Sequence, residues 1–259
     1  MKPQLTYYDI DPSVSAFSTT RHGGCGTGAY GEFNINRYCG DTDEAVSRNL
    51  ELLSRELGID ASRIIMPHQN HGITVRQIAA DFLTLPQNIR TMILEGTDAL
   101  ITDVKGVCIG VSTADCIPVL LFDPVHKAVG AVHAGWRGTV RCVVGKAIDA
   151  MWMTYGSRPA DLKAVIGPGI SVDAFEVGDE VYTRFEAAGF DMKAVSRRKE
   201  KWHIDLPLCN SMQMQALGVA ESNITMTGIC TYNNPDDYFS ARRLGADSGR
   251  IFTAVSLKA

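Results

Sequence analysis

Residues 107–138 read VCIGVSTADCIPVLLFDPVHKAVGAVHAGWRG and contain two apolar runs, Ile117–Phe122 and Ala128–Val132. Short apolar runs like these are typical of buried β-strands. The Asp123-Pro124 pair between them favours a turn, so we expect an antiparallel hairpin. Cys116 directly precedes the first run and His133 directly follows the second. The hairpin would therefore bring this thiol and this imidazole to the same end.

A cysteine and a histidine at one end of a hairpin support two kinds of chemistry. A thiolate and an imidazole are typical ligands of zinc. The same two groups can act as a nucleophile and its general base. The stretch itself leaves both interpretations open.

The composition of the whole chain limits the classes of protein to consider. The chain has 259 residues, 45% of them hydrophobic, and a formal net charge of -4. Without a repeat, low-complexity tract or linker, we expect one domain over residues 1–259. The acidic balance argues against nucleic-acid binding. No apolar run approaches the ~20 residues that cross a membrane, and residues 1–13 lack the apolar segment of a secretory signal.

The seven cysteines are scattered and include no Cys-x-x-Cys pair. An odd number of scattered cysteines in a long chain is typical of reduced thiols, so we expect a cytoplasmic protein. The missing Cys-x-x-Cys pair argues against a structural zinc finger.

Outward from the hairpin, the sequence predicts strands that are separated partly by turns and partly by helices. The predicted strands are 14–19, 73–78, 96–102, 107–111, 162–166, 224–230 and 250–255; the predicted helices are 41–58, 139–155, 179–188 and 206–217, and residues 81–95 form a partly helical connection. This mixture indicates an α+β fold with a mixed β-sheet or sandwich core flanked by helices. In the first helix, Arg48 and Asn49 fall outside the apolar stripe, and we expect both on a solvated face.

Three loops carry residues that suggest binding. His68 and His71 flank Gln69 in a polar loop before a predicted strand, where a ligand role and an ordinary surface loop are both open. The Gly-rich loop after Arg21 could cradle an anion or be a plain turn. Arg137 stands in a small-residue segment before a helix and could grip a phosphate or form a surface ion pair.

Together, His71, Cys116 and His133 provide two imidazoles and one thiolate. Three protein ligands with an open fourth position are typical of a catalytic zinc site. Asp115 adjoins the thiolate. It could carry protons or orient a substrate, or it could merely cap the strand end.

These motifs resemble those of the YfiH or laccase-domain family, whose members are variously labelled polyphenol oxidase, purine nucleoside phosphorylase and peptidoglycan editing factor. The matching segments are 20–24, the region of Asn34, 68–72, 96–99, 112–118, 133–138, 167–168, 175–178, 239–240 and 242–243. The Ala-Asp-Cys and His-Ala-Gly-Trp-Arg-Gly segments are the most specific of these. The loop after Gly167-Pro168 lacks the cysteines that the family often has, and Asn70 replaces the usual Val.

The resemblance implies a fold similar to the cysteine-hydrolase fold of a bacterial toxin catalytic domain. It implies a zinc site at His71, Cys116 and His133, which is the trio that the residues themselves suggest. It also implies phosphorolysis of adenosine, inosine, guanosine and methylthioadenosine, together with deamination of adenosine.

The leading hypothesis is therefore a zinc-dependent purine nucleoside phosphorylase with small-molecule substrates. The candidate catalytic residues are His71, Cys116, His133 and Asp115, and the candidates for binding substrate or phosphate are Arg21, Arg48, Gln69 and Arg137. One alternative is a metal-free cysteine hydrolase of cell-wall precursors, with Cys116 as nucleophile and His133 as base. Copper-dependent phenol oxidation is a weaker alternative, because multicopper chemistry needs more histidine ligands than six scattered ones provide. The fourth hypothesis is a metal-binding module without enzymatic activity.

Overall fold

The computed structural model describes residues 1–258 and is built on two β-sheets. The larger sheet has six strands in the order β13-β9-β7-β8-β5-β4. Its strands are β4 (Val75–Gln77), β5 (Ala99–Thr102), β7 (Ile117–Asp123), β8 (Ala128–Ala134), β9 (Lys163–Ile166) and β13 (Ile224–Met226). The two outermost pairs are parallel and the central pairs antiparallel, so the sheet is mixed.

The predicted hairpin forms the centre of this sheet. β7 and β8 pair antiparallel, with Ile117 opposite Ala134 and Pro118 opposite His133. This register confirms that Cys116 and His133 lie at the same end of the hairpin.

The second sheet has five strands in the order β1-β2-β14-β6-β3. Its strands are β1 (Leu5–Tyr8), β2 (Val14–Thr19), β3 (Ile64–Ile65), β6 (Cys108–Thr113) and β14 (Ile251–Leu257). The central strand β14 pairs antiparallel with both β2 and β6, so the C-terminal segment is held between two strands from earlier in the chain.

The two sheets pack face to face, and their strands alternate between two apolar layers. In β7, Leu120 and Phe122 pack toward the second sheet, whereas Val119 and Leu121 belong to the cluster on the opposite face. This period of two is the geometry of a strand that is buried on both faces. The alternation predicts that His133, two residues after Ala131, faces the space between the sheets.

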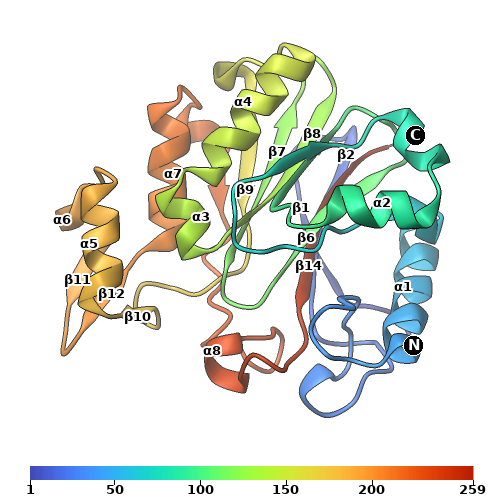
Figure 1. Cartoon of the computed structure of the whole chain (residues 1–259), viewed down its shortest axis with the longest axis horizontal. Helices are drawn as coiled ribbons and strands as arrows, with labels where there is room; N and C mark the ends of the chain where they lie inside the picture. Colours follow the sequence, from blue (N-terminus) through green and yellow to red (C-terminus); the bar gives the residue numbers. More distant parts are fainter. Residues whose placement is uncertain (259) are drawn as a thin grey trace.

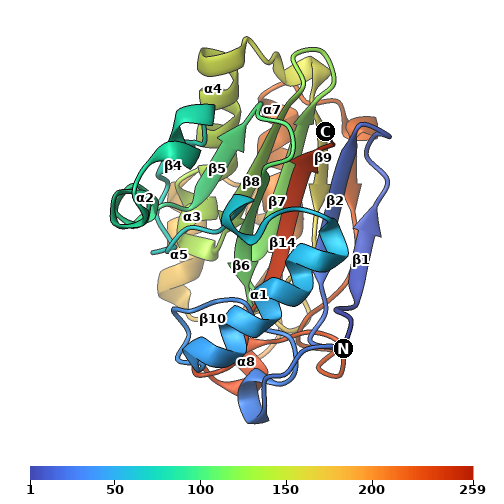
Figure 2. The same ribbon diagram turned by 90° about the vertical axis from the view of Figure 1, so that its right-hand side faces the viewer.

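Helices cover the outer faces of both sheets (Figures 1 and 2). The larger sheet is covered by α3 (Trp136–Val140), α4 (Val143–Tyr155) and α7 (Leu206–Ala216), and the smaller sheet by α1 (Asp43–Leu57). α2 (Gln87–Leu94) contributes Leu94 to the layer between the sheets. The arrangement is an α+β sandwich flanked by helices, which confirms the predicted fold class.

Helix α1 begins and ends where the sequence predicts. The Thr42 hydroxyl accepts a hydrogen bond from the Ala45 N–H, and Gly58 ends the helix in a left-handed conformation with φ of 64°. The expectation of a solvated Asn49 is wrong, because Asn49 is fully buried. Its amide binds the carbonyls of Glu32 and Asn34, and its oxygen accepts from the Cys25 N–H.

Two other predicted elements differ from the structure. The helix expected over 139–155 is two helices, α3 and α4, and Cys142 between them has a left-handed φ of 58°. The strand expected over 224–230 ends at Met226, after which the Thr227 N–H bonds the Ile166 carbonyl and Gly228 turns the chain with φ of 68°.

A small unit at one side of the molecule was not predicted as a sheet (Figure 1). It contains β10 (Glu176–Val177), β11 (Ser196–Arg198), β12 (Trp202–Ile204), α5 (Asp179–Ala187) and α6 (Met192–Val195). The short helix α8 (Ala241–Leu244) lies in the loop that leads back to β14. Over residues 1–258, no helix combines the length and the apolar character that a membrane span requires.

Candidate metal centre

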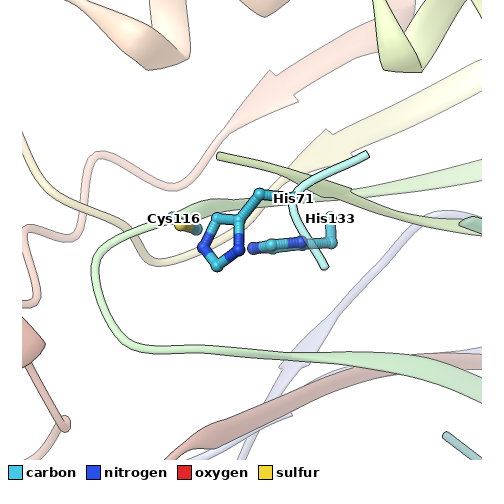
Figure 3. A group of neighbouring side chains, drawn as sticks. All are labelled: His71, Cys116 and His133. Atoms are coloured by element: carbon cyan, nitrogen blue, oxygen red, sulfur yellow. The ribbon is translucent and has the colours of Figure 1, made fainter. Parts of the chain in front are cut away.

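His71, Cys116 and His133 converge at one end of the sandwich (Figure 3). Their potential ligand atoms all lie within 4.8 Å of one another. Two ligand atoms at about 2.0–2.3 Å from a tetrahedral zinc ion lie about 3.3–3.8 Å apart, so side-chain movements of about 1 Å would close the three around an ion. His133 is buried, Cys116 is half-buried and His71 is exposed, which leaves the cluster open on one side.

The hairpin positions two of the three potential ligands. Cys116 directly precedes β7, and His133 stands in β8 opposite Pro118. His71 comes from the loop before β4 and has a left-handed φ of 62°. Such a conformation is uncommon for a residue other than glycine, so tertiary contacts must hold the loop in place.

Asp98 supplies those contacts from the residue before β5. Its Oδ1 accepts from the His71 N–H at 3.0 Å, and its Oδ2 accepts from the Gly72 N–H at 2.7 Å. Asp98 Oδ1 also lies 2.7 Å from His133 Nδ1. One buried carboxylate thus holds two of the three potential ligands.

The bond between Asp98 and His133 fixes the orientation of the imidazole. With the Nδ1 proton directed at the carboxylate, Nε2 is left free to bind a metal. Burial would raise the pKa of Asp98, but the hydrogen bond and charge of His133 outweigh it and lower that pKa. Asp98 lies in a motif quoted from the sequence, yet no role was predicted for it, because its partners are remote along the chain.

Cys116 and His133 shift each other's pKa in opposite directions. Burial alone would raise the pKa of the Cys116 thiol, but attraction to His133 and hydrogen bonds from both histidines lower it. Burial alone would lower the pKa of His133, but the Cys116 thiolate and the Asp98 carboxylate raise it. The site therefore favours a thiolate, which is the form that binds metals and attacks electrophiles.

Gly135 leaves the space that an ion beside these ligands would need. A Cβ atom at Gly135 would lie 3.0 Å from Cys116 Sγ and 3.0 Å from His71 Cδ2. Any other residue would therefore crowd both ligands.

The three potential ligands line a cavity of about 380 Å³. Its other lining residues include Asn36, Tyr38, Cys39, His68, Gln69, Ser112 and Arg250. Among the described residues that line it, none is acidic. The Arg250 guanidinium donates to the carbonyls of Ala246, Ser248 and Gly249, which are neutral acceptors, so the cavity keeps a positive charge.

The predicted binding residue Gln69 lies in this cavity, but its amide is already engaged. Gln69 Nε2 donates to the Ser112 carbonyl and its Oε1 accepts from the Ser112 N–H, both at 2.8 Å. The pair of bonds ties the loop that carries His71 to the end of β6.

Asp115 is directed toward the C-terminal loops. Its Oδ1 accepts from the Thr231 hydroxyl at 2.7 Å, and its Oδ2 accepts from the Arg242 N–H at 2.6 Å. The Ile170 N–H bonds its carbonyl, and its φ is 85°. These contacts fix the turn that presents Cys116.

The three predicted phosphate-binding arginines are absent from the described lining of the cavity. Arg21 donates to the carbonyls of Gly31 and Pro235 and packs over Phe239. Arg48 borders a separate cavity beside Cys25, and Arg137 packs over the Trp136 ring. Arg250, which was not among the predicted binding residues, lines the cavity of the candidate metal centre.

Comparison with known proteins identifies the family. A family model described as "Multi-copper polyphenol oxidoreductase laccase" matches residues 15–258. A protein from Bacteroides thetaiotaomicron named purine nucleoside phosphorylase is 44% identical, and the match covers 95% of this chain and 92% of that protein. A protein named adenosine deaminase RL5, from an unknown prokaryotic organism, is 39% identical, with coverage of 95% and 94%.

Solved structures of similar proteins point to the same family. The Bacillus licheniformis hypothetical protein YfiH superimposes with a TM-score of 0.86 at 27% identity, covering 97% of this chain and 99% of that one. Protein NMB0706 of Neisseria meningitidis gives a TM-score of 0.85 at 30% identity, with both chains covered in full. The chain therefore belongs to the laccase-like YfiH family, as its motifs indicated.

Proposed function

We propose that this protein is a zinc-dependent purine nucleoside phosphorylase that also deaminates adenosine. The observation that carries the proposal is the convergence of His71, Cys116 and His133 in an open cavity. Relatives at 44% and 39% identity bear the names of these two activities. The proposed substrates are adenosine, inosine, guanosine and methylthioadenosine, together with phosphate.

The donor set fits zinc. One thiolate and two imidazoles match its preferred ligands, and the open side of the cluster matches a catalytic site. Zinc bound there would act as a Lewis acid toward a substrate or water oxygen. Multicopper oxidase chemistry fits less well, because one Cys and two His provide too few ligands for several copper ions.

The chain's own residues would prepare the site for both reactions. Asp98 holds His133 and the His71 loop in place, and Gly135 keeps the space beside the ligands free. In phosphorolysis, a phosphate oxygen attacks the sugar C1′ as the bond to purine N9 breaks. The phosphate needs a cationic partner in the cavity, and we assign this role to Arg250 because it lines the cavity, unlike Arg21, Arg48 and Arg137.

A second candidate function is a cysteine hydrolase that edits peptidoglycan precursors. Cys116, His133 and Asp98 have the order of a nucleophile, a base and a residue that orients the base. The lowered pKa of Cys116 favours this interpretation as well. Cys116 cannot attack a substrate while it binds zinc, so the two functions exclude each other at one time.

Product analysis on zinc-loaded protein tests the proposed function. With inosine, we expect hypoxanthine and ribose 1-phosphate in equal amounts, and only when phosphate is present. With adenosine and no phosphate, we expect inosine and ammonia. Absence of both reactions with all four nucleosides would contradict the proposal.

The Arg250→Gln variant tests the phosphate assignment. Hydrogen bonds to charged groups contribute about 1.5–3 kcal/mol, so the KM for phosphate should rise about tenfold or more, while adenosine deamination changes little. Arg137→Gln is the matched control and should leave both reactions unchanged. A raised KM for phosphate in Arg137→Gln, with an unchanged KM in Arg250→Gln, would assign phosphate binding to Arg137 instead.

A further inference from the structure

A stacked pair of aromatic rings, Tyr38 and His68, stands in the wall of the metal cavity. Their ring centroids are 4.0 Å apart and their planes differ by 17°. Both residues line the cavity with the three metal-binding candidates. Tyr38 is 40% exposed and the His68 side chain 41% exposed, so part of the aromatic surface of the pair stays accessible beside the face that each ring uses in the stack.

The pair is held in place by contacts at the His68 ring and at the Tyr38 backbone. His68 Nδ1 lies 2.9 Å from both carboxylate oxygens of Glu95. The Tyr38 N–H donates to Asn36 Oδ1 at 2.6 Å, and the Asn36 amide donates to the Ser112 hydroxyl. Because Gln69 also binds Ser112, the loops that carry Tyr38 and His68 are joined at the end of β6.

Besides the two imidazoles of the candidate metal site and the Arg250 guanidinium, the rest of the described cavity wall offers no other flat group. Apart from the potential metal ligands, the other described residues that line it are small or polar, such as Ser112, Thr113, Ala114 and Ala241. The amide of Gln69 is occupied by Ser112 and so is not free to read a ligand. A planar heteroaromatic ring that enters the cavity therefore finds its best surface on Tyr38 and His68.

We propose that Tyr38, supported by His68, is the stacking platform for the purine base. This inference rests on the proposed function, and it specifies where the base binds. Stacking on an aromatic ring tolerates many bases, because each has a π-face. A site that holds the base by stacking accepts adenine, hypoxanthine and guanine alike, which accounts for the broad purine range in the proposed function.

Substitution of Tyr38 tests the platform. The Tyr38→Leu variant should bind hypoxanthine about tenfold to a hundredfold more weakly by calorimetry, given the strength of base stacking on aromatic side chains. The KM for inosine and the KM for adenosine should rise by similar factors. The KM for phosphate should stay within about twofold of the wild-type value. The Tyr38→Phe variant keeps the ring and should behave like the wild type.

Tyr182→Leu is the matched control. Tyr182 stacks on Trp202 at 3.9 Å and 20°, so the control loses the same kind of contact outside the cavity. It should leave hypoxanthine binding and both KM values unchanged.

The calorimetric arm separates this inference from the proposed function. If wild-type protein turns over inosine and Tyr38→Leu binds hypoxanthine equally well, the platform is overturned and the function stands. Equal losses in Tyr38→Phe and Tyr38→Leu would assign the effect to the hydroxyl group and also overturn it. If the wild type neither binds hypoxanthine nor acts on nucleosides, both the platform and the proposed function fall.

Discussion

At the scale of single residues, Asp98 links the potential metal ligands to the fold. Its carboxylate bonds His133 Nδ1 and the N–H groups of His71 and Gly72. The three potential ligands could be proposed from the sequence, because Cys and His are recognisable by type and the hairpin places Cys116 and His133 at one end. Asp98 was not, because a carboxylate before a strand has many ordinary roles. Its partners are visible only in the structure.

Replacing Asp98 with Asn should weaken metal binding. Loss of such a supporting partner typically reduces metal affinity about 10–100-fold. Zinc retention against a competing chelator measures the effect. Asp123→Asn is the matched control, because Asp123 is also buried and bound to a histidine, His126, but at the far end of the hairpin. Equal zinc retention in the wild type and Asp98→Asn would show that Asp98 does not support the site.

The lowered pKa of Cys116 predicts an unusual pH profile in metal-free protein. Thiolate is the reactive form, so alkylation of Cys116 should increase through a midpoint well below the ordinary thiol value of about 8.5. Cys108 is buried and its pKa is raised to about 12, so it should stay unmodified at neutral pH. Mass spectrometry after timed iodoacetamide treatment gives the profile. A midpoint at or above 8.5 would contradict the thiolate–imidazolium pair.

At the scale of elements, apolar pattern and turn residues predict the hairpin and helix α1 well. They fail where a polar side chain takes a structural role or where local geometry interrupts a regular pattern. The apolar spacing of Val140, Val144 and Ile148 continues across the break between α3 and α4, so the sequence pattern does not reveal that break. Asn49 is buried because it forms hydrogen bonds with a loop that is distant in the sequence. The period of the apolar residues cannot indicate such a role.

Asn49→Ala tests that structural role. The substitution leaves the Asn34 carbonyl and the Cys25 N–H without their partner, whereas the Glu32 carbonyl keeps its bond from the Gly26 N–H. Unsatisfied buried groups cost about 1–3 kcal/mol each, so the free energy of unfolding should fall by at least about 2 kcal/mol in urea titrations. The neighbouring Arg48→Ala should change it by less than about 0.5 kcal/mol, as for most surface positions. Similar effects of the two variants would argue against a structural role for Asn49.

At the scale of the whole molecule, the sequence predicted the α+β sandwich. Some predicted strands are joined by turns and others are separated by helices, and this mixture is typical of that fold class. The order of the strands in the smaller sheet could not be predicted. The C-terminal strand β14 pairs with both β2 and β6, and β2 lies near the other end of the chain. The small sheet of β10, β11 and β12 was also missed, because its strands have only two or three residues and such segments carry little periodic signal.

The expectation of one domain is a prediction about cooperativity. If the two sheets and the small unit share one core, they should unfold in a single transition. Far-ultraviolet circular dichroism would follow the sheets and helices, and fluorescence of Trp202 in β12, with Trp136 and Trp152 replaced by Phe, would follow the small unit. Coincident urea transitions are expected. An earlier transition of Trp202 would show that the small unit unfolds independently.

The central claim is that Cys116 acts as a zinc ligand in the working enzyme. The measurement is activity on adenosine with phosphate before and after chelation, together with the intact mass of the protein during turnover. We expect chelation to abolish both phosphorolysis and deamination, added zinc to restore both, and the mass to stay that of the unmodified chain. Full activity in metal-free protein, or a substrate adduct on Cys116, would contradict the account and favour the cysteine hydrolase.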